Sequence, residues 1–271
     1  AQLVLSAFLI MLGLGQLVAG SMSDTLGRRP VLLAGSLLFT VAGAAALISP
    51  NIELLIVARA LQGFGASACM AVGRVIINDS FDKTEAGRQL STITMIMAIV
   101  PMLGFAGGGL VADIIGWRGT VGIMVITAGV IFLANMALLA ETNHNRVARA
   151  PILKVVGVFY LLLRKREFVV HATSGALLTA AFFALGGFMP YEFQRLGASA
   201  TMIGLLFSIT AFGYMSGNNL SRYMGPRLGL ERTVFIGGMV SLAAVVMLLA
   251  LYLAGLAAAL VIAGCLYFFG V

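Results

Sequence analysis

The sequence predicts an all-α integral membrane protein with nine membrane-crossing helices. Hydrophobic residues make up 61% of its 271 positions and charged residues only 10%, whereas an ordinary soluble domain carries about 25% charged residues. The chain also divides into nine apolar runs, and a helix needs about 20 such residues to cross a bilayer. A water-soluble fold is excluded, because the charges are too few to form its hydrated surface.

The first five runs are separated by short links that contain turn-forming or charged residues. The first run has no basic segment before it, so we expect a span rather than a cleaved signal. Ser-Asp-Thr-Leu-Gly-Arg-Arg-Pro at 23–30 ends this run, Ser-Pro-Asn at 49–51 ends the second, and the charged link 79–89 ends the third. The expected spans are 1–22, 31–49, 52–78, 90–115 and 117–140.

The last four runs follow a longer connection, 141–167. It carries six basic residues around the apolar run 155–163, which predicts an amphipathic segment at the membrane surface. Gly-Pro-Arg-Leu-Gly at 225–229 separates the second and third of these runs. The expected spans are 168–190, 200–220, 233–253 and 256–271. The predicted organisation is an N-terminal bundle (1–140), a cytoplasmic linker (141–167) and a C-terminal bundle (168–271).

The net charge of +7 is explained by membrane orientation and not by nucleic-acid binding. Of the 17 basic residues, 13 lie in the links 23–30, 79–89, 141–167 and 221–232, and only two lie in the opposite links. Positive residues accumulate on the cytoplasmic side of membrane proteins. We therefore expect the first set of links in the cytoplasm and no nucleic-acid partner.

Arg59 is a charged residue inside an apolar run, where a charge costs at least about 2.5 kcal/mol. At helical spacing, the face of its segment that carries Arg59 also carries Gly63, Ala66, Met70, Arg74 and Ile77. It thus combines a cation with small residues and a flexible methionine. This pattern predicts the wall of a water-filled cavity in which Arg59 meets an anionic group. The alternative is a structural arginine that pairs with backbone carbonyls or extends toward the membrane surface.

The remaining polar residues favour transport over catalysis. All ten acidic residues lie in links or at the ends of runs, and no cluster has the spacing of a catalytic pair, a metal site or a phosphate-binding loop. Cys69 and Cys265 both lie within apolar runs and are expected to be packing residues. We expect neither an enzyme nor a metal protein.

Two segments resemble motifs of the major facilitator superfamily. Gly20-Ser-Met-Ser-Asp24-Thr-Leu-Gly27-Arg28-Arg29-Pro30 resembles motif A, the loop after the second helix of that fold. Leu55-Ile-Val-Ala-Arg59-Ala-Leu-Gln62-Gly63-Phe-Gly65 resembles the fourth-helix motif of its proton-coupled members. The run from Gly20 through Gly65 is most similar to the bicyclomycin-resistance and multidrug branch of drug:proton antiporters.

The resemblance implies a fold of twelve helices in two bundles, of which this chain would provide helices 2–10. It implies a transport role for Arg59, Gln62 and Gly63, with the proton-carrying acid in helix 1. It also implies a conformational latch in which the motif A acid caps a helix of the second bundle and the following arginine pairs with an acid after helix 4. The matching latch residues are Gly20, Asp24, Gly27, Arg28, Arg29 and Asp79.

The fifth-helix antiporter motif, Gly-Pro-x-x-Gly-Gly, is similar to Gly104-Phe105-Ala-Gly-Gly108-Gly109. Phe105 replaces the proline, and Pro101 lies four residues earlier. A proline followed by glycines predicts a bend or a close helix contact. The departure from the motif leaves the mode of coupling open.

The resemblance favours export of lipophilic or cationic drugs in exchange for protons by alternating access. It implies a monomer in the inner membrane of a bacterium, with protons, substrate and lipid as partners and no cofactor beyond the proton gradient. The alternatives are an uptake symporter for a sugar or organic acid and a non-transporting sensor or intramembrane enzyme. Residue type alone selects the candidates for the substrate cavity, which are Met70, Met97, Phe182, Phe183 and Asn218.

Overall fold

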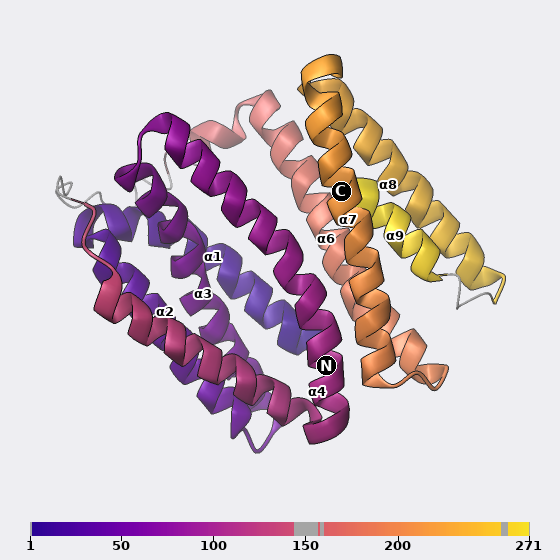
Figure 1. Ribbon diagram of the computed structural model, residues 1–271, viewed down its shortest axis with the longest axis horizontal. Coiled ribbons are helices and arrows are strands. Elements are labelled where there is room, and N and C mark those ends of the chain that lie inside the picture. The colour runs from indigo at the N-terminus through magenta and orange to yellow at the C-terminus, as the bar shows by residue number, and fades with distance from the viewer. Residues whose placement is uncertain (1, 144–156, 158–159, 256–259, 271) are drawn as a thin grey trace. The chain divides into compact units, whose positions relative to one another are not determined.

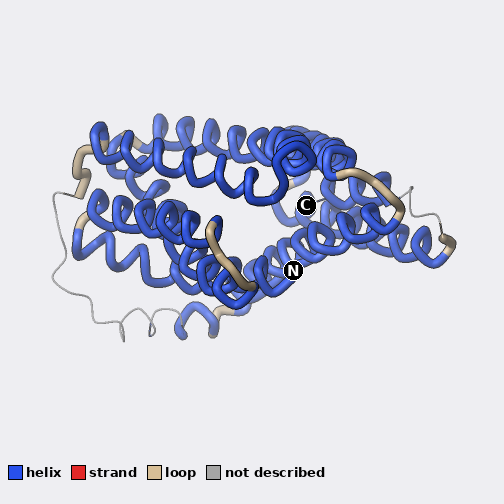
Figure 2. The backbone as a smooth tube through the Cα atoms, turned by 90° about the horizontal axis from the view of Figure 1, so that it is seen from below, coloured by secondary structure: helices blue, strands red, loops and turns tan. Residues whose placement is uncertain are grey.

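The computed structural model describes residues 2–143, 157, 160–255 and 260–270. These residues are almost entirely helical, and no strand occurs among them (Figure 1, Figure 2). The helices are α1 (Gln2–Leu26), α2 (Arg28–Leu47), α3 (Ile52–Ser80), α4 (Lys83–Leu138), α6 (Arg166–Arg195), α7 (Ala200–Leu228), α8 (Leu230–Leu253) and α9 (Leu260–Gly270). The predicted all-α fold is confirmed.

Gly116 interrupts α4, because its backbone (φ 73°, ψ 176°) leaves the helical region. Glycine adopts such a positive φ at little cost. The interruption lies where the sequence predicts one span to end at 115 and the next to begin at 117. With α4 counted once, seven helices of the described chain are long and apolar enough to cross a bilayer. Part of the ninth predicted span, 256–271, lies outside the described residues.

Contacts between residues divide the chain into two units. Unit 1 contains Ala1–Thr92 and Trp117–Lys165, and unit 2 contains Ile93–Gly116 and Arg166–Val271. The part of α4 from Ile93 to Gly116 therefore packs with the later helices, and its beginning and its second half pack with the earlier ones.

This grouping differs from the predicted bundles, 1–140 and 168–271, which follow chain order. The predicted linker, 141–167, lies mostly outside the described residues. Its amphipathic character therefore stays a prediction.

In unit 1, α3 packs against both α1 and α2 through small residues. A Cβ atom at Gly63 would collide with the Phe8 carbonyl of α1, and one at Gly65 would lie 2.6 Å from the Gly35 carbonyl oxygen of α2. Small residues of this kind let helix backbones approach closely within a membrane. The buried core of this unit consists of Ala19, Val31, Leu32, Ala68 and Val72.

In unit 2, α9 packs against α7 and α8. A Cβ atom at Gly213 would collide with the Cys265 carbonyl, and one at Gly217 would collide with the Phe269 carbonyl. Tyr267 is fully buried and donates a hydrogen bond of 2.6 Å to the Leu178 carbonyl oxygen of α6. The core of this unit consists of Leu185, Met189, Phe193, Phe207, Ala244 and Tyr267.

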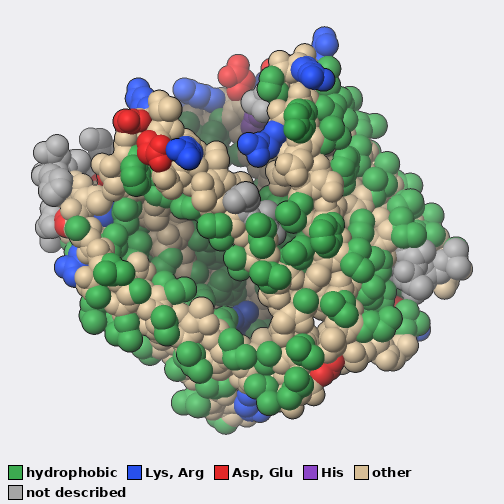
Figure 3. Space-filling model, viewed as in Figure 1, with side chains coloured by type: hydrophobic (Ala, Val, Ile, Leu, Met, Phe, Trp, Pro, Cys, Tyr) green, Lys and Arg blue, Asp and Glu red, His purple; other side chains and the backbone are tan. Residues whose placement is uncertain are grey.

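The surface of the helices is apolar along their flanks. Figure 3 shows hydrophobic side chains over the helix flanks and charged side chains mainly near helix ends. Large side chains such as Leu14, Ile126 and Val246 are more than half exposed. Exposing so much apolar area to water would be unfavourable, so this surface fits a lipid environment.

Candidate functional site

Arg59 lies in α3, within unit 1, and its guanidinium is held by a neighbour on the same helix. Arg59 Nη1 donates a hydrogen bond of 2.8 Å to Gln62 Oε1. Gln62 is fully buried, and its amide nitrogen lies 3.8 Å from the Met124 sulfur atom in the second half of α4. Two of the predicted transport residues, Arg59 and Gln62, are thus in direct contact, and their role in transport stays a prediction.

Arg59 also contacts α1. Its guanidinium carbon lies 5.1 Å from the centre of the Phe8 ring, which is within the range of a cation–π interaction. Gly63 lies one turn further along α3, where it lets the α1 backbone approach at Phe8. Gly63 therefore allows close packing of α1 and α3 at this point, and its predicted role in transport stays a prediction.

None of the ion pairs found in the described part of the chain involves Arg59. The arginine is thus oriented by an uncharged amide and an aromatic ring, with its positive charge uncompensated by a carboxylate of the described residues. Such a cation lowers the free energy of a nearby negative charge. The site can therefore bind an anionic group or favour release of a proton from a neighbouring acid.

A second site, the charge cluster, forms at the turn between α1 and α2. Gly27 has φ 108°, a conformation that favours glycine, and it reverses the chain between the two helices. Arg28 follows and is 8% exposed. Its side chain donates to Ser23 Oγ (2.8 Å), to Asp24 Oδ1 and to Asp79 Oδ2 (2.9 Å). The predicted pairing of the motif A arginine with the acid at the end of α3 is therefore observed.

Glu141, which the sequence analysis did not select, completes this cluster. Glu141 Oε1 accepts from the backbone N–H of Arg28 at 2.9 Å, and Oε2 accepts from that of Arg29 at 3.3 Å. Gly27 precedes α2 and has no side chain to cap it. The carboxylate therefore satisfies two of the free N–H groups at the helix start, where the helix dipole also favours a negative charge.

Asn143 extends the same contact to the end of α1. Its amide nitrogen donates to the backbone carbonyl oxygens of Ser23 (3.3 Å) and Asp24 (3.1 Å). The segment Glu141–Asn143 thus caps the end of α1 and the beginning of α2 at once. The only signal for it in the sequence is an acid that directly follows an apolar run.

The pKa of Glu141 is lower than that of a free glutamate. Burial acts to raise it, but the backbone N–H groups of Asn143, Arg28, Arg29 and Thr142 stabilise the charged form, and the net shift is downward. The cap is therefore charged at neutral pH.

The other predicted latch residues lie around the turn. Arg29 Nη2 donates to the Met136 carbonyl oxygen of α4 at 2.9 Å. Gly20 lies one turn before Asp24, and a Cβ atom there would meet nothing within 4 Å. The Asp24 side chain remains 51% exposed although it contacts Arg28. Asp24 thus keeps a solvent-facing carboxylate.

The predicted fifth-helix motif lies in the first half of α4, in unit 2. The helix continues through Pro101, and the bend occurs at Gly116 instead. A Cβ atom at Gly109 would collide with the Ala200 carbonyl of α7, whereas one at Gly104 would meet nothing within 4 Å. The motif glycines are therefore not equivalent, since Gly109 is required for contact and Gly104 is not.

Gly108 and its neighbours line a small cavity of about 220 Å³ within unit 2. Its wall is formed by α4, α6 and α7, and the Phe105 and Phe207 rings lie there with their centres 5.2 Å apart. The replacement of the motif proline by Phe105 thus adds an aromatic contact to α7.

The residues selected as substrate-cavity candidates are divided between the two units. Met70 and Met97 are 39% and 47% exposed and belong to different units. Phe182 and Phe183 contact each other edge to face at 5.2 Å, and Asn218 is exposed on α7. Their role in binding stays a prediction.

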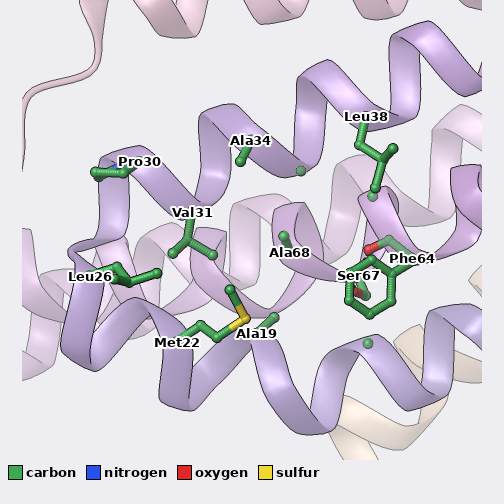
Figure 4. A pocket seen from close by; sticks show the side chains of 13 residues that line it. Ala19, Met22, Leu26, Pro30, Val31, Ala34, Leu38, Phe64, Ser67 and Ala68 are labelled. Atoms are coloured by element: carbon green, nitrogen blue, oxygen red, sulfur yellow. Dashed lines mark hydrogen bonds between the residues drawn. The ribbon is translucent and has the colours of Figure 1, made fainter. Parts of the chain in front are cut away.

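A second cavity, of about 300 Å³, lies in unit 1 between α1, α2 and α3 (Figure 4). Its wall is almost entirely apolar, and Figure 4 shows Met22, Val31 and Leu38 around it, with the Ser67 hydroxyl beside Phe64. The Ser67 hydroxyl donates to the Phe64 carbonyl at 2.6 Å.

No group of metal-binding side chains occurs among the residues that the structure describes.

Comparisons with known proteins identify a family model that matches the whole chain and relatives that match most of it. A family model described as Major Facilitator Superfamily matches residues 1–271. The chain is 32% identical to an uncharacterized MFS-type transporter of Bacillus subtilis, YdgK, over 80% of this chain and 55% of the relative. It is 30% identical to a chloramphenicol resistance protein of Pseudomonas aeruginosa (87% and 56%) and 30% identical to multidrug resistance protein D of Escherichia coli (76% and 52%). The chain thus spans about half the length of these relatives.

The fold is also similar to solved structures. The chain superposes on the crystal structure of a D-xylose-proton symporter with a TM-score of 0.72. The match covers 98% of this chain and 68% of the symporter. The sequence identity is 16%, so this likeness concerns the fold.

Proposed function

Because the chain belongs to the major facilitator superfamily, we propose that it is part of a transporter that exports lipophilic or cationic drugs in exchange for protons. The family consists of transporters and not of enzymes. The names of two relatives, a chloramphenicol resistance protein and multidrug resistance protein D, support drugs as the substrate class.

The Arg59 site is the observation that carries the proposal. A cation oriented by Gln62 and Phe8, without an acid among its observed partners, is suited to control a proton on a nearby carboxylate. When this acid is protonated, Arg59 loses an anionic neighbour, and when the acid releases its proton the attraction returns. The resemblance implies that this acid lies in helix 1 of the family fold.

Alternating access requires contacts that break and form again. We assign this role to the charge cluster of Asp24, Arg28 and Asp79, with the exposed Asp24 carboxylate as the group that reaches a helix of the second bundle. A carboxylate at a helix N-terminus is worth about 0.3–1 kcal/mol. Such an energy biases two conformations without locking either.

The thirteen basic residues of one set of links support a cytoplasmic location for the charge cluster. The transporter would then lie in the inner membrane of a bacterium as a monomer. The proton gradient would be its energy source, and no cofactor would be needed.

The test compares two arginines of α3 in cells that express the complete gene. Arg59→Ala should remove drug resistance, whereas Arg74→Ala should retain it, because Arg74 is exposed on the same helix. A protonophore should abolish the resistance given by the natural protein. Resistance that survives both the protonophore and Arg59→Ala would contradict the proposal.

An uptake symporter for a sugar or organic acid is the second candidate. The observation that favours it is Phe105, which stands where the antiporter motif has proline. The variant Phe105→Pro restores the motif and distinguishes the two candidates, because drug export by an antiporter should stay unchanged or increase.

A further inference from the structure

Asp113 joins the end of the first α4 segment to the beginning of α7, within unit 2. Its Oδ1 atom accepts from the Ala200 backbone N–H at 3.0 Å, and its Oδ2 atom accepts from the Thr201 N–H at 2.7 Å. The helix also has its own cap, because Ser199 Oγ accepts from the Met202 N–H at 3.2 Å. The first N–H groups of α7 are therefore shared between a local cap and a carboxylate from another helix.

Close contacts continue along the two helices from this point. A Cβ atom at Gly204 would collide with the Phe105 carbonyl, just as one at Gly109 would collide with that of Ala200. One turn further, Ser208 Oγ donates to the Met102 carbonyl oxygen at 2.7 Å. Residue numbers fall on α4 as they rise on α7, so the two segments run antiparallel, with Asp113 at one end of the contact.

Asp113 differs from the other contacts because water reaches it. The residue is exposed, whereas Phe207 on the contact face is 4% exposed. Water can replace the carboxylate at the α7 N–H groups, so this contact can open at little cost. The charge of Asp113 and the positive end of the α7 dipole favour its closure again.

We propose that Asp113 is an outer latch, a carboxylate that holds the outer ends of α4 and α7 together and releases them when this end opens. It is the counterpart, at the predicted outer ends, of the charge cluster at the α1–α2 turn. The inference rests on the proposed function, because only an alternating-access transporter needs such an opening. Asp113 acts through helix position and touches no substrate.

The test measures how fast a cysteine beneath the latch is labelled from outside. Ile203 lines the cavity between α4 and α7, so Ile203→Cys is introduced into the complete protein after Cys69 and Cys265 are replaced by alanine. A membrane-impermeant maleimide is added to intact cells. Asp113→Ala should increase the labelling rate about two- to fivefold, the size expected for an exposed carboxylate at a helix N-terminus.

Asp82→Ala is the matched control. Asp82 also accepts from two backbone N–H groups at a helix start, those of Thr84 and Glu85, but it caps its own helix. Its removal should leave the labelling rate unchanged. An equal rate in Asp113→Ala and the parent protein, or an equal increase in Asp82→Ala, would overturn the latch.

A second pair of variants tests the same contact without changing a charge. Gly109→Ala forces a methyl group against the Ala200 carbonyl and should increase labelling, whereas Gly107→Ala meets open space and should not. Drug export is measured in parallel. Unchanged labelling with intact export rejects the latch alone, whereas increased labelling in a protein that exports no drug rejects the proposed function alone.

Discussion

At the scale of single residues, the orientation of Arg59 depends on a small number of uncharged partners. Gln62 is fully buried, and the one further hydrogen-bond partner observed for its side chain among the described residues is the Met124 sulfur, a weak acceptor. Its hydrogen bond with Arg59 is therefore the main polar interaction that fixes both side chains. Phe8 holds the opposite side of the guanidinium.

Replacing Gln62 should disturb transport more than folding. Gln62→Leu keeps most of the side-chain volume but removes the acceptor for Arg59, and a hydrogen bond to a charged group contributes about 1.5–3 kcal/mol. We expect drug efflux to fall about tenfold or more while the expression level stays near that of the parent. Gln16→Leu is the control, because Gln16 is exposed and contacts only the Met70 sulfur. Equal efflux in both variants would show that Gln62 does not position Arg59.

The Glu141 cap should make stability depend on pH. The pKa of Glu141 is lowered in the folded protein, so the carboxylate contributes its stability above the unfolded value of about 4.3. This contribution is lost as pH falls through the lower folded value.

Glu141→Gln should therefore lower the melting temperature of the purified protein at pH 7, by the equivalent of about 1 kcal/mol. The difference from the parent should shrink as the pH falls below 4. Glu231→Gln is the control, because Glu231 lies in the first turn of α8, in unit 2, and is not a member of the charge cluster. A difference that persists unchanged at low pH would contradict the charged cap.

The sequence alone predicts the site residues that belong to a local motif. It does not predict the site residues whose contacts join distant parts of the chain. Arg59, Gln62 and the Arg28–Asp79 pair could be selected because they lie in motifs of fixed spacing. Glu141 contacts Arg28 across 113 positions, and no periodicity in the sequence reports a contact of that length. Phe8 was missed for the same reason.

At the scale of helices, apolar runs marked the spans but not the helix ends. The first predicted span ends at 22 and α1 continues to Leu26, while the fourth begins at 90 and α4 begins at Lys83. Runs of apolar residues report the part of a helix that lies in lipid. The actual starts are set by capping side chains such as Asn51, Asp82 and Ser199, each of which accepts a backbone N–H.

Two glycines of α3 should respond in opposite directions to the same substitution. Alanine favours a helix over glycine by about 1 kcal/mol, so Gly73→Ala should slightly raise the melting temperature, because its Cβ would meet nothing within 4 Å. Gly63→Ala should lower it by several degrees, because the methyl group collides with the Phe8 carbonyl. Thermal unfolding in detergent measures both. A stabilised Gly63→Ala would show that α1 and α3 are not in close contact there.

At the scale of the whole molecule, composition predicts a protein with several membrane-crossing helices, but not how the helices group. The part of α4 from Ile93 to Gly116 is covalently continuous with unit 1 on both sides and yet packs in unit 2, through Gly109 and the Phe105 carbonyl. Glycines at positions 104, 107, 108 and 109 predict a packing surface, but they do not predict which helix packs against it. Only the three-dimensional contacts distinguish Gly109, which is required, from Gly104.

The central claim is that drug and protons move in opposite directions through the protein. The direct measurement uses the complete protein, reconstituted into vesicles that contain a pH-sensitive dye, with an imposed drug gradient. Drug that moves into the vesicles should drive protons out, so the interior should become more alkaline, and Arg59→Ala should abolish this change while Arg74→Ala retains it. Acidification of the interior as drug enters, or a proton flux driven by a sugar and not by any drug, would contradict the account.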